Sequence, residues 1–353
     1  YERPAYLAEG IATENYRMPF TNIEAKVPRP EYPISIKENF KRAYTRNNPV
    51  WVPCSMTDMV NTMVAMLTGQ GEADWSRKDR YDWNDWFGVE WTYIPEAGGP
   101  MLKPGTKFLD DITNWETGVK FPNLNDYDIE GLCKKFMAEK YNPEKITHVN
   151  IGQGCTERLV ALLGGYTDAL VTLVEEPEAV KDFLEAFVDF TIGLFDKLTE
   201  YVPIDMITYH DDWGTERDTF FSPKMMEEIV FDPTKRLFDH FKSKDVCIEL
   251  HSCGKIERFV PYMIDLGVDF MQIQARANDM KMLKEKYGDK IGFNIMIMPE
   301  DDSDEALDKA IHEAIDTFGK GGGMYSAIMA KGPEKVWHAA MEHYYYGREF
   351  YEK

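Results

Sequence analysis

Short apolar runs alternate with long amphipathic segments along most of the chain. The amphipathic segments repeat apolar residues at three- and four-residue spacing, a pattern typical of α-helices that alternate with β-strands. The alternation predicts eight strands, which cover residues 50–54, 87–94, 147–152, 205–210, 246–251, 270–274, 291–297 and 323–328.

Three of the intervening segments give strong helix signals. They cover residues 176–201, 222–243 and 302–321, and each carries one apolar face. Regular alternation of strand and helix predicts a parallel sheet, and eight units favour closure into a (β/α)8 TIM barrel over an open sheet. The chain lacks G-x-x-x-x-G-K-[ST], and no G-x-G-x-x-G follows the first strand, so the usual nucleotide-binding alternatives lose support.

Two parts of the chain depart from this alternation. Residues 1–45 are rich in Pro and charge, and we expect an N-terminal arm that ends in a short helix. Residues 46–353 then form a single barrel domain. Its segment at about 70–130 is too rich in Trp, Gly and Pro for plain strand–helix units. We expect this segment to be an insertion, either a hairpin or an aromatic-rich lid.

Composition narrows the class of protein. The 353 residues include 40 Lys and Arg against 61 Asp and Glu, a net charge of −21, which disfavours nucleic acid and anionic membranes as partners. The five cysteines are widely spaced and odd in number, which suits free thiols in a reducing cytoplasm. No stretch approaches the roughly 20 apolar residues that cross a bilayer. We therefore expect a soluble cytoplasmic protein, and the sequence carries no signal of its oligomeric state.

Polar side chains gather where the predicted strands end, which is where barrel enzymes place their active sites. An unpaired polar group there costs about 1–3 kcal/mol, so these residues need partners or a role. The set comprises Cys54, Ser55, Asn150, Gln153, Tyr209, His210, Asp211, Asp212, His251, Cys253, Gln272, Gln274, Asn294, Met296 and Tyr325.

The densest cluster lies in "YHDDWGTERD", residues 209–218. Adjacent carboxylates at a strand end suit general acid–base work or metal binding, and one of them could instead cap a helix. Asp211 is nearer to the strand and is the predicted functional carboxylate, whereas capping is an equally good interpretation of Asp212. His210, Asp211 and His251 are the predicted catalytic residues.

His251 and Cys253 are two residues apart, so they share one side of the sheet if the strand continues that far. Imidazole and thiolate are good zinc donors, but a zinc site needs at least three protein ligands. A core cysteine beside a hydrogen-bonded histidine is the simpler interpretation. A cysteine nucleophile is a further alternative, although no elbow motif surrounds it.

The aromatic residues of the insertion are more often packing groups than ligand contacts. A ring-rich loop over a barrel mouth would nevertheless suit an apolar or aromatic substrate. The predicted substrate-binding residues are Trp86, Phe87, Trp91, Asn150, Tyr209, Gln272, Gln274 and Tyr325.

Residues 209–274 resemble the uroporphyrinogen-decarboxylase-like superfamily, whose members are (β/α)8 barrels. Its D-D-x-G-T, S-P, H-S-C-G and G-V-D segments occur here in order, and "DWFGVEW" resembles a segment of its methyltransferase-like branch. True decarboxylases carry an Arg-rich segment after the first strand, where this chain has "VWVPCSMTDMV". The resemblance therefore favours the other branch, the cobalamin-dependent methyltransferases, which exchange a methyl group with a corrinoid held on a partner protein.

In the members of that branch that methylate thiols, an H-x-C pair and a later cysteine hold zinc. His251 and Cys253 match the pair, but no cysteine follows Cys253. The resemblance thus implies either a replacement third donor or no tightly bound zinc. Glu249 is the predicted replacement, with Asp211 and His210 as further candidates.

The missing cysteine favours a methyltransferase that moves a methyl group from a methoxylated, aromatic substrate to the Co(I) corrinoid of its partner. This reaction is an O-demethylation, in which a poor phenolate leaving group needs a proton or a Lewis acid. Two alternatives stay open: a zinc-dependent methylcorrinoid:thiol methyltransferase, and a binding protein of this superfamily without catalysis.

Overall fold

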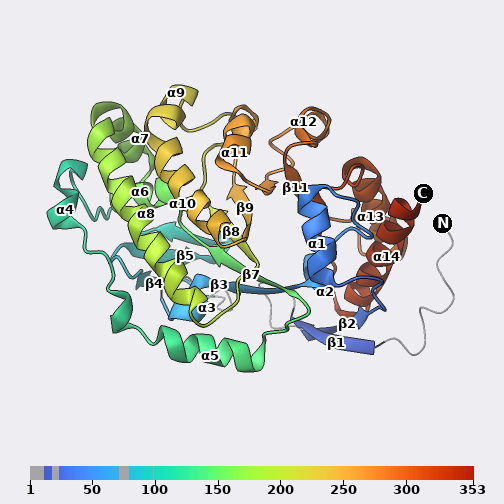
Figure 1. The fold of residues 1–353 in the computed structure, drawn as a ribbon. Helices are drawn as coiled ribbons and strands as arrows, with labels where there is room; N and C mark the ends of the chain where they lie inside the picture. The colour runs from blue at the N-terminus through green and yellow to red at the C-terminus, as the bar shows by residue number, and fades with distance from the viewer. Residues whose placement is uncertain (1–11, 18–23, 71–78, 98) are drawn as a thin grey trace.

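A computed structural model describes residues 12–17, 24–70, 79–97 and 99–353, and its centre is a curled parallel sheet (Figure 1). The strands follow the order β12-β11-β10-β9-β8-β7-β3. They are β3 (Met59–Met63), β7 (Ile146–Ile151), β8 (Met206–His210), β9 (Cys247–Ser252), β10 (Phe270–Ile273), β11 (Gly292–Ile297) and β12 (Met324–Ile328). Cys54 joins the sheet through a single parallel bridge to Ser326 of β12. The predicted α/β, TIM-barrel-like fold is confirmed.

Two predicted strands were wrong in detail. Residues 50–54 contribute only the Cys54 bridge. Residues 87–94 do not join the barrel, because β5 (Glu90–Ile94) pairs antiparallel with β4 (Tyr81–Asn84) and β6 (Gly99–Leu102) in a separate sheet. The sequence pattern missed β3, since it lies between the short helices α2 (Ser55–Asp58) and α3 (Val64–Thr68) without an intervening turn residue.

The three strongest helix signals correspond to observed helices. They are α8 (Pro177–Thr199), α10 (Phe231–Ser243) with its preceding turns, and α13 (Asp304–Phe318). The segment before α10 is irregular. The short helix α9 (Pro223–Met225) is followed by a π-helical turn at Met226–Val230, which leads directly into α10. Pro233 lacks an N–H and its ring crowds the carbonyl four residues earlier, which accounts for the wider turn.

The remaining helices surround the sheet or support its ends. They are α4 (Trp115–Gly118), α5 (Ile129–Glu139), α6 (Cys155–Leu162), α7 (Tyr166–Glu175), α11 (Val260–Leu266), α12 (Met280–Tyr287) and α14 (Pro333–Glu352). Within the described ranges, none of the helices is both long and apolar enough to cross a membrane.

The N-terminal segment closes the amino end of the barrel. β1 (Ala12–Arg17) and β2 (Glu24–Arg29) form an antiparallel hairpin, and β2 lies against α14. The helix α1 (Ile36–Thr45) follows and inserts Phe40 beside the rings of Phe270 and Tyr325. Residues 1–11 and 18–23 of the arm predicted over 1–45 lie outside the described residues.

A chain of hydrogen bonds crosses the barrel interior. His148 bonds Asn61 through Nδ1 and Thr208 through Nε2, both at 2.6 Å. Thr208 donates to Glu249 at 2.7 Å, and the Tyr325 hydroxyl donates to the other carboxylate oxygen. These polar groups can be buried because each forms a hydrogen bond, which compensates for the loss of contact with water. A buried polar group without a partner would destabilise the folded state.

Candidate active site at the barrel mouth

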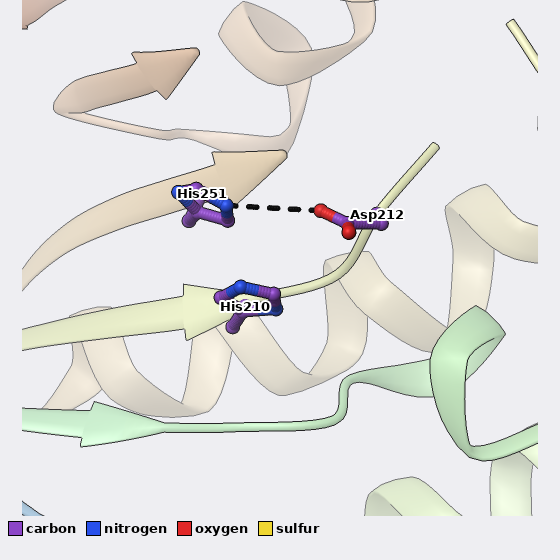
Figure 2. A group of neighbouring side chains, drawn as sticks. All are labelled: His210, Asp212 and His251. Atoms are coloured by element: carbon purple, nitrogen blue, oxygen red, sulfur yellow. Dashed lines mark ion pairs between the residues drawn. The ribbon is translucent and has the colours of Figure 1, made fainter. Parts of the chain in front are cut away.

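His210 and His251 stand side by side at the carboxyl ends of β8 and β9 (Figure 2). Their rings stack with centroids 4.1 Å apart and planes 20° apart. Asp212, on the loop after β8, places Oδ1 3.7 Å from His251 Nε2. One ligand atom from each of the three residues lies within 4.8 Å of the others, which is a spacing that a metal ion can bridge.

Each imidazole is fixed by a partner on its Nδ1 side. His210 Nδ1 bonds Glu157 Oε2 at 2.8 Å, and His251 Nδ1 bonds Gln272 Oε1 at 2.6 Å. Metal-binding histidines are commonly oriented in this way, with the second nitrogen left for the ion. The Cys253 sulfur lies 3.6 Å from His251 Nε2 and supplies a further soft donor.

The two histidines differ in their affinity for protons. Burial lowers the pKa of His210, but the Glu157 hydrogen bond and the charges of Glu157 and Asp212 outweigh it and raise the pKa to about 9. Burial and the charge of His210 lower the pKa of His251 to about 4. Near neutral pH, without a metal, one ring of the stack is therefore protonated and the other neutral.

Asp211 and Asp212 lie differently from what the sequence suggested, which was a functional role for Asp211 and, equally well, a capping role for Asp212. Asp211 is fully buried and accepts hydrogen bonds from the first turn of α6, namely from Thr156 and the Glu157 amide, and from the Trp213 indole. Asp211 is thus the helix-capping carboxylate, and its burial raises its pKa to about 7. Asp212 does not cap this helix and turns toward His251. Consecutive side chains at a strand end point in different directions, so the two aspartates cannot face the same group.

Close backbone contact between two loops brings Asp212 toward the end of β9. A Cβ atom on Gly254, whose φ is +89°, would lie 2.2 Å from the carbonyl carbon of Gly214. The Cys253 amide donates to Asp212 Oδ1 at 2.6 Å, and the Trp213 amide donates to the Ser252 hydroxyl at 2.9 Å. The glycines of the D-D-x-G-T and H-S-C-G segments therefore serve this loop contact.

Three predicted site residues lie elsewhere. Glu249 is one layer deeper in the barrel, two residues before His251, and both of its oxygens accept hydrogen bonds there. Tyr325 is buried beside it. Tyr209 faces out of the barrel, where its hydroxyl accepts from the Cys155 amide at 2.8 Å and its ring contacts Phe238. None of the three lies beside the Nε2 atoms of the histidine pair.

The predicted amides have supporting roles. Gln272 holds His251, as described, and Gln274 accepts a hydrogen bond from the Gly254 amide at 3.1 Å. Asn150 donates to the Thr62 carbonyl at 3.2 Å and is half-buried on β7. Gln272 therefore contacts the histidine pair directly, and Gln274 acts on the loop that carries Cys253.

Three aromatic residues of the insertion pack against other side chains of the protein. Trp86 contacts Tyr127 and Phe190, and the buried Phe87 contacts Phe187. The Trp91 indole donates to Asp85 at 3.1 Å. Trp86 and Phe87 therefore pack between the insertion and α8, and Trp91 stacks on Trp83. The substrate-binding role expected of these rings stays a prediction.

Asp85 joins this insertion to α6. Its carboxylate accepts from the Phe87 and Val89 amides and forms a fully buried ion pair with Arg158 at 2.6 Å. The Arg158 guanidinium also lies 4.2 Å from the Phe87 ring centroid. Because Glu157 precedes Arg158 on α6, one helix turn connects the insertion to the partner of His210.

Comparison with known proteins identifies the family. The family model for uroporphyrinogen decarboxylase (URO-D) matches residues 137–318, which is more than half of the chain. The chain belongs to the URO-D family. The match spans His210, Asp212, His251 and Cys253, and the three-stranded insertion lies outside it. A comparison with curated proteins found no match.

Solved structures share the fold of this URO-D family member. A methyltransferase from Methanosarcina mazei aligns with 91% of this chain and 100% of its own, at 13% identity and a TM-score of 0.62. A D-psicose 3-epimerase aligns with 63% of this chain and 81% of its own, at 13% identity and a TM-score of 0.33. The first similarity confirms the barrel fold, and the second is too weak to support an argument.

Two residues of the histidine cluster and its support, Glu157 and Asp212, were not assigned to the site from the sequence. Glu157 is 53 residues from His210 in the chain, so only the fold shows their contact. Asp212 was equally well explained as a cap. Tyr166, the first residue of α7, and Phe220, on the loop after β8, stack with centroids 4.3 Å apart, and their separation in the chain gave no signal of this contact. The polar run after residue 152, at the end of a predicted strand, was the available hint for Glu157.

Methionines edge another part of the mouth. Met296 follows Asn294 at two-residue spacing and shares its side of β11, while Met298 and Met329 come directly after the last residues of β11 and β12. About half of each side chain or more is exposed. We refer to these three residues as the methionine rim.

Proposed function

We propose that this protein is a methyltransferase that transfers a methyl group from a methoxylated aromatic donor to the Co(I) corrinoid of a partner protein. One observation carries the proposal: His210, His251 and Asp212 converge at the barrel mouth, with both Nδ1 atoms already occupied by partners. Membership of the URO-D family and the fold shared with a methyltransferase support it. The corrinoid supplies the Co(I) nucleophile when the partner is docked.

The donor set fits a zinc ion. Two imidazole nitrogens and one carboxylate oxygen are the ligands of many catalytic zinc sites, which leave a further position for substrate. His210 and His251 would bind through Nε2 and Asp212 through Oδ1, with the Cys253 thiol nearby. The zinc would act as a Lewis acid toward the ether oxygen of the donor. Asp212 and His210 would thereby take the place of the later cysteine that the sequence lacks.

The chain's own residues orient and stabilise the leaving oxygen. Glu157 and Gln272 hold the two imidazoles in place, so His251 Nε2 stays directed toward Asp212. When the methyl group leaves, the electrons of the broken C–O bond remain on oxygen, which needs a cation or a proton. A zinc ion held by the three donors would supply the cation, or, without metal, the protonated ring of His210 would supply the proton. The two versions differ in their dependence on metal.

The same donor set favours a second candidate, a zinc-dependent methylcorrinoid:thiol methyltransferase. Three convergent donors satisfy the minimum that catalytic zinc requires, even though the later cysteine is absent. In that reaction the metal lowers the pKa of the acceptor thiol and the methyl group moves in the opposite direction.

A single assay separates these functions. The purified protein is mixed with a corrinoid protein in the Co(I) state and a series of methoxyarenes, and methyl–Co(III) formation is followed by absorbance, with metal content measured on the same sample. We expect transfer from at least one methoxyarene and its loss in His251→Ala, while His240→Gln, a surface control paired with Asp196, remains active.

The other outcomes are equally informative. Methyl transfer from methylcorrinoid to thiols, with none from ethers, would establish the second candidate. Donor binding without turnover would indicate a binding protein. Failure to form methyl–Co(III) from every donor, with a fully reduced corrinoid, would rule out the proposed O-demethylation.

A further inference from the structure

Tyr166 and Phe220 form an aromatic pair that the protein only partly covers. Their rings stack with centroids 4.3 Å apart and planes 23° apart. Tyr166 is 39% exposed and Phe220 is half-buried. Exposed, stacked rings leave apolar area in contact with water, which makes such a pair a candidate contact surface for a ligand.

The two rings lie next in the chain to the elements that build the histidine cluster. Tyr166 is the first residue of α7, directly after α6, whose first turn carries Glu157. Phe220 ends the loop that begins at Asp212, and its amide donates to the Trp213 carbonyl at 2.8 Å. Tyr166 thus follows the helix that carries the partner of His210, and Phe220 lies on the loop that carries Asp212.

The surroundings of the pair are acidic. Burial is the largest cause that raises the pKa of the Tyr166 phenol. The negative charges of Glu157, Asp212, Asp211 and Cys253 raise the pKa further, in that order. Glu157 lies on the helix before α7, and Asp211 and Asp212 lie on the loop that leads to Phe220, so the carboxylates of the site belong to the segments that adjoin the two rings. At the adjacent rim, Arg276 is already paired with Glu216 at 2.6 Å. A ligand that carries its own carboxylate would meet like charges here.

We propose that Tyr166 and Phe220 form the wall on which the ring of the methyl donor stacks, and that this wall selects uncharged aromatic ethers over carboxylated ones. The inference rests on the proposed function and deepens it by naming the substrate class. A planar ring stacked on the pair would hold its methoxy group toward the histidine cluster. The Trp86, Phe87 and Trp91 rings pack against other side chains of the protein.

Calorimetric binding tests this proposal without the corrinoid partner. The ligands are 2-methoxyphenol and 4-hydroxy-3-methoxybenzoate, which differ by a carboxylate. Tyr166→Leu and Phe220→Leu are each expected to weaken 2-methoxyphenol binding by about 3- to 10-fold, the size of one aromatic stacking contact. Tyr166→Phe should bind within about twofold of the wild type, because it keeps the ring.

Tyr262→Leu is the matched control. Tyr262 lies on α11, where its hydroxyl donates to Glu227 and its ring contacts Phe259, and it should bind the ligand as the wild type does. Thermal melting of each variant establishes that it is folded. In the wild type, the benzoate should bind at least about 10-fold more weakly than the phenol, since it adds an unpaired charge near carboxylates.

The outcomes separate this inference from the proposed function. Unchanged binding in both leucine variants would overturn the aromatic wall, and equal affinity for the two ligands would overturn the selection by charge. The wild type could bind no aromatic ether and still transfer a methyl group from a non-aromatic donor to the corrinoid. That result would overturn the aromatic wall but leave the protein a methyltransferase.

Discussion

Gly254 lies against Gly214 so closely that the two loops carrying the D-D-x-G-T and H-S-C-G segments meet backbone to backbone. A Gly254→Ala substitution adds a methyl group to this contact at a positive φ, so we expect a loss of about 2–3 kcal/mol in the free energy of unfolding. Urea denaturation measures it.

Gly267→Ala is the appropriate comparison. Gly267 also has a positive φ, +84°, but a Cβ atom there would meet nothing within 4 Å. Only backbone strain remains, which costs about 1 kcal/mol. Equal losses in the two alanine variants would show that the loop contact has no stabilising role beyond the φ angle.

Asp212, and not Glu249, is expected to complete the zinc site. Asp212→Ala should weaken zinc binding by more than about 100-fold, because it removes one of three ligands. Glu249→Gln should leave the affinity nearly unchanged, since Glu249 is engaged with Thr208 and Tyr325. Competition with a chromophoric chelator measures both affinities. If only the Glu249 variant lost zinc, the ligands would be those suggested by the sequence, His251, Cys253 and Glu249.

Glu157 should control the protonation of His210. In the metal-free protein, Glu157→Gln removes the charge and the charge-assisted hydrogen bond that raise the pKa of His210, while burial continues to lower it. The pKa should fall from about 9 to below its ordinary value, so that the ring becomes neutral at pH 7. NMR titration of the histidine ring protons measures this change.

Glu185→Gln serves as the control for that titration, because Glu185 pairs with Arg236 on the helical face of the molecule. It should leave His210 protonated at pH 7. Were the pKa of His210 to stay near 9 without the Glu157 carboxylate, the ion pair would not be its cause.

The buried ion pair between Asp85 and Arg158 should be costly to break. Asp85→Ala leaves the guanidinium buried without its counter-charge, for which we expect a loss of about 3–5 kcal/mol in the free energy of unfolding. Asp232→Ala removes the partner of Lys181 at the surface and should cost less than about 1 kcal/mol. Chemical denaturation of both variants compares them, and similar losses would contradict the distinction by burial.

The sequence predicts the barrel well because its strands are continuous apolar runs with local signals. Six of the predicted strands, from 147–152 onward, correspond to β7 through β12 in part. The site is harder to predict, since it depends on directions and distant contacts. Whether Asp211 or Asp212 faces His251 depends on a single residue of register, and the Glu157 contact exists only because α6 folds over the end of β7.

The methionine rim gives the barrel mouth a chemical vulnerability. Thioethers in contact with solvent are oxidised to sulfoxides, which replace a pliable apolar edge with a polar and chiral one. Met296, Met298 and Met329 are exposed in this way, at the same end of the barrel as the half-buried thiol of Cys253. The methionine rim, where substrate and partner would bind, therefore stays apolar only in surroundings with few oxidants.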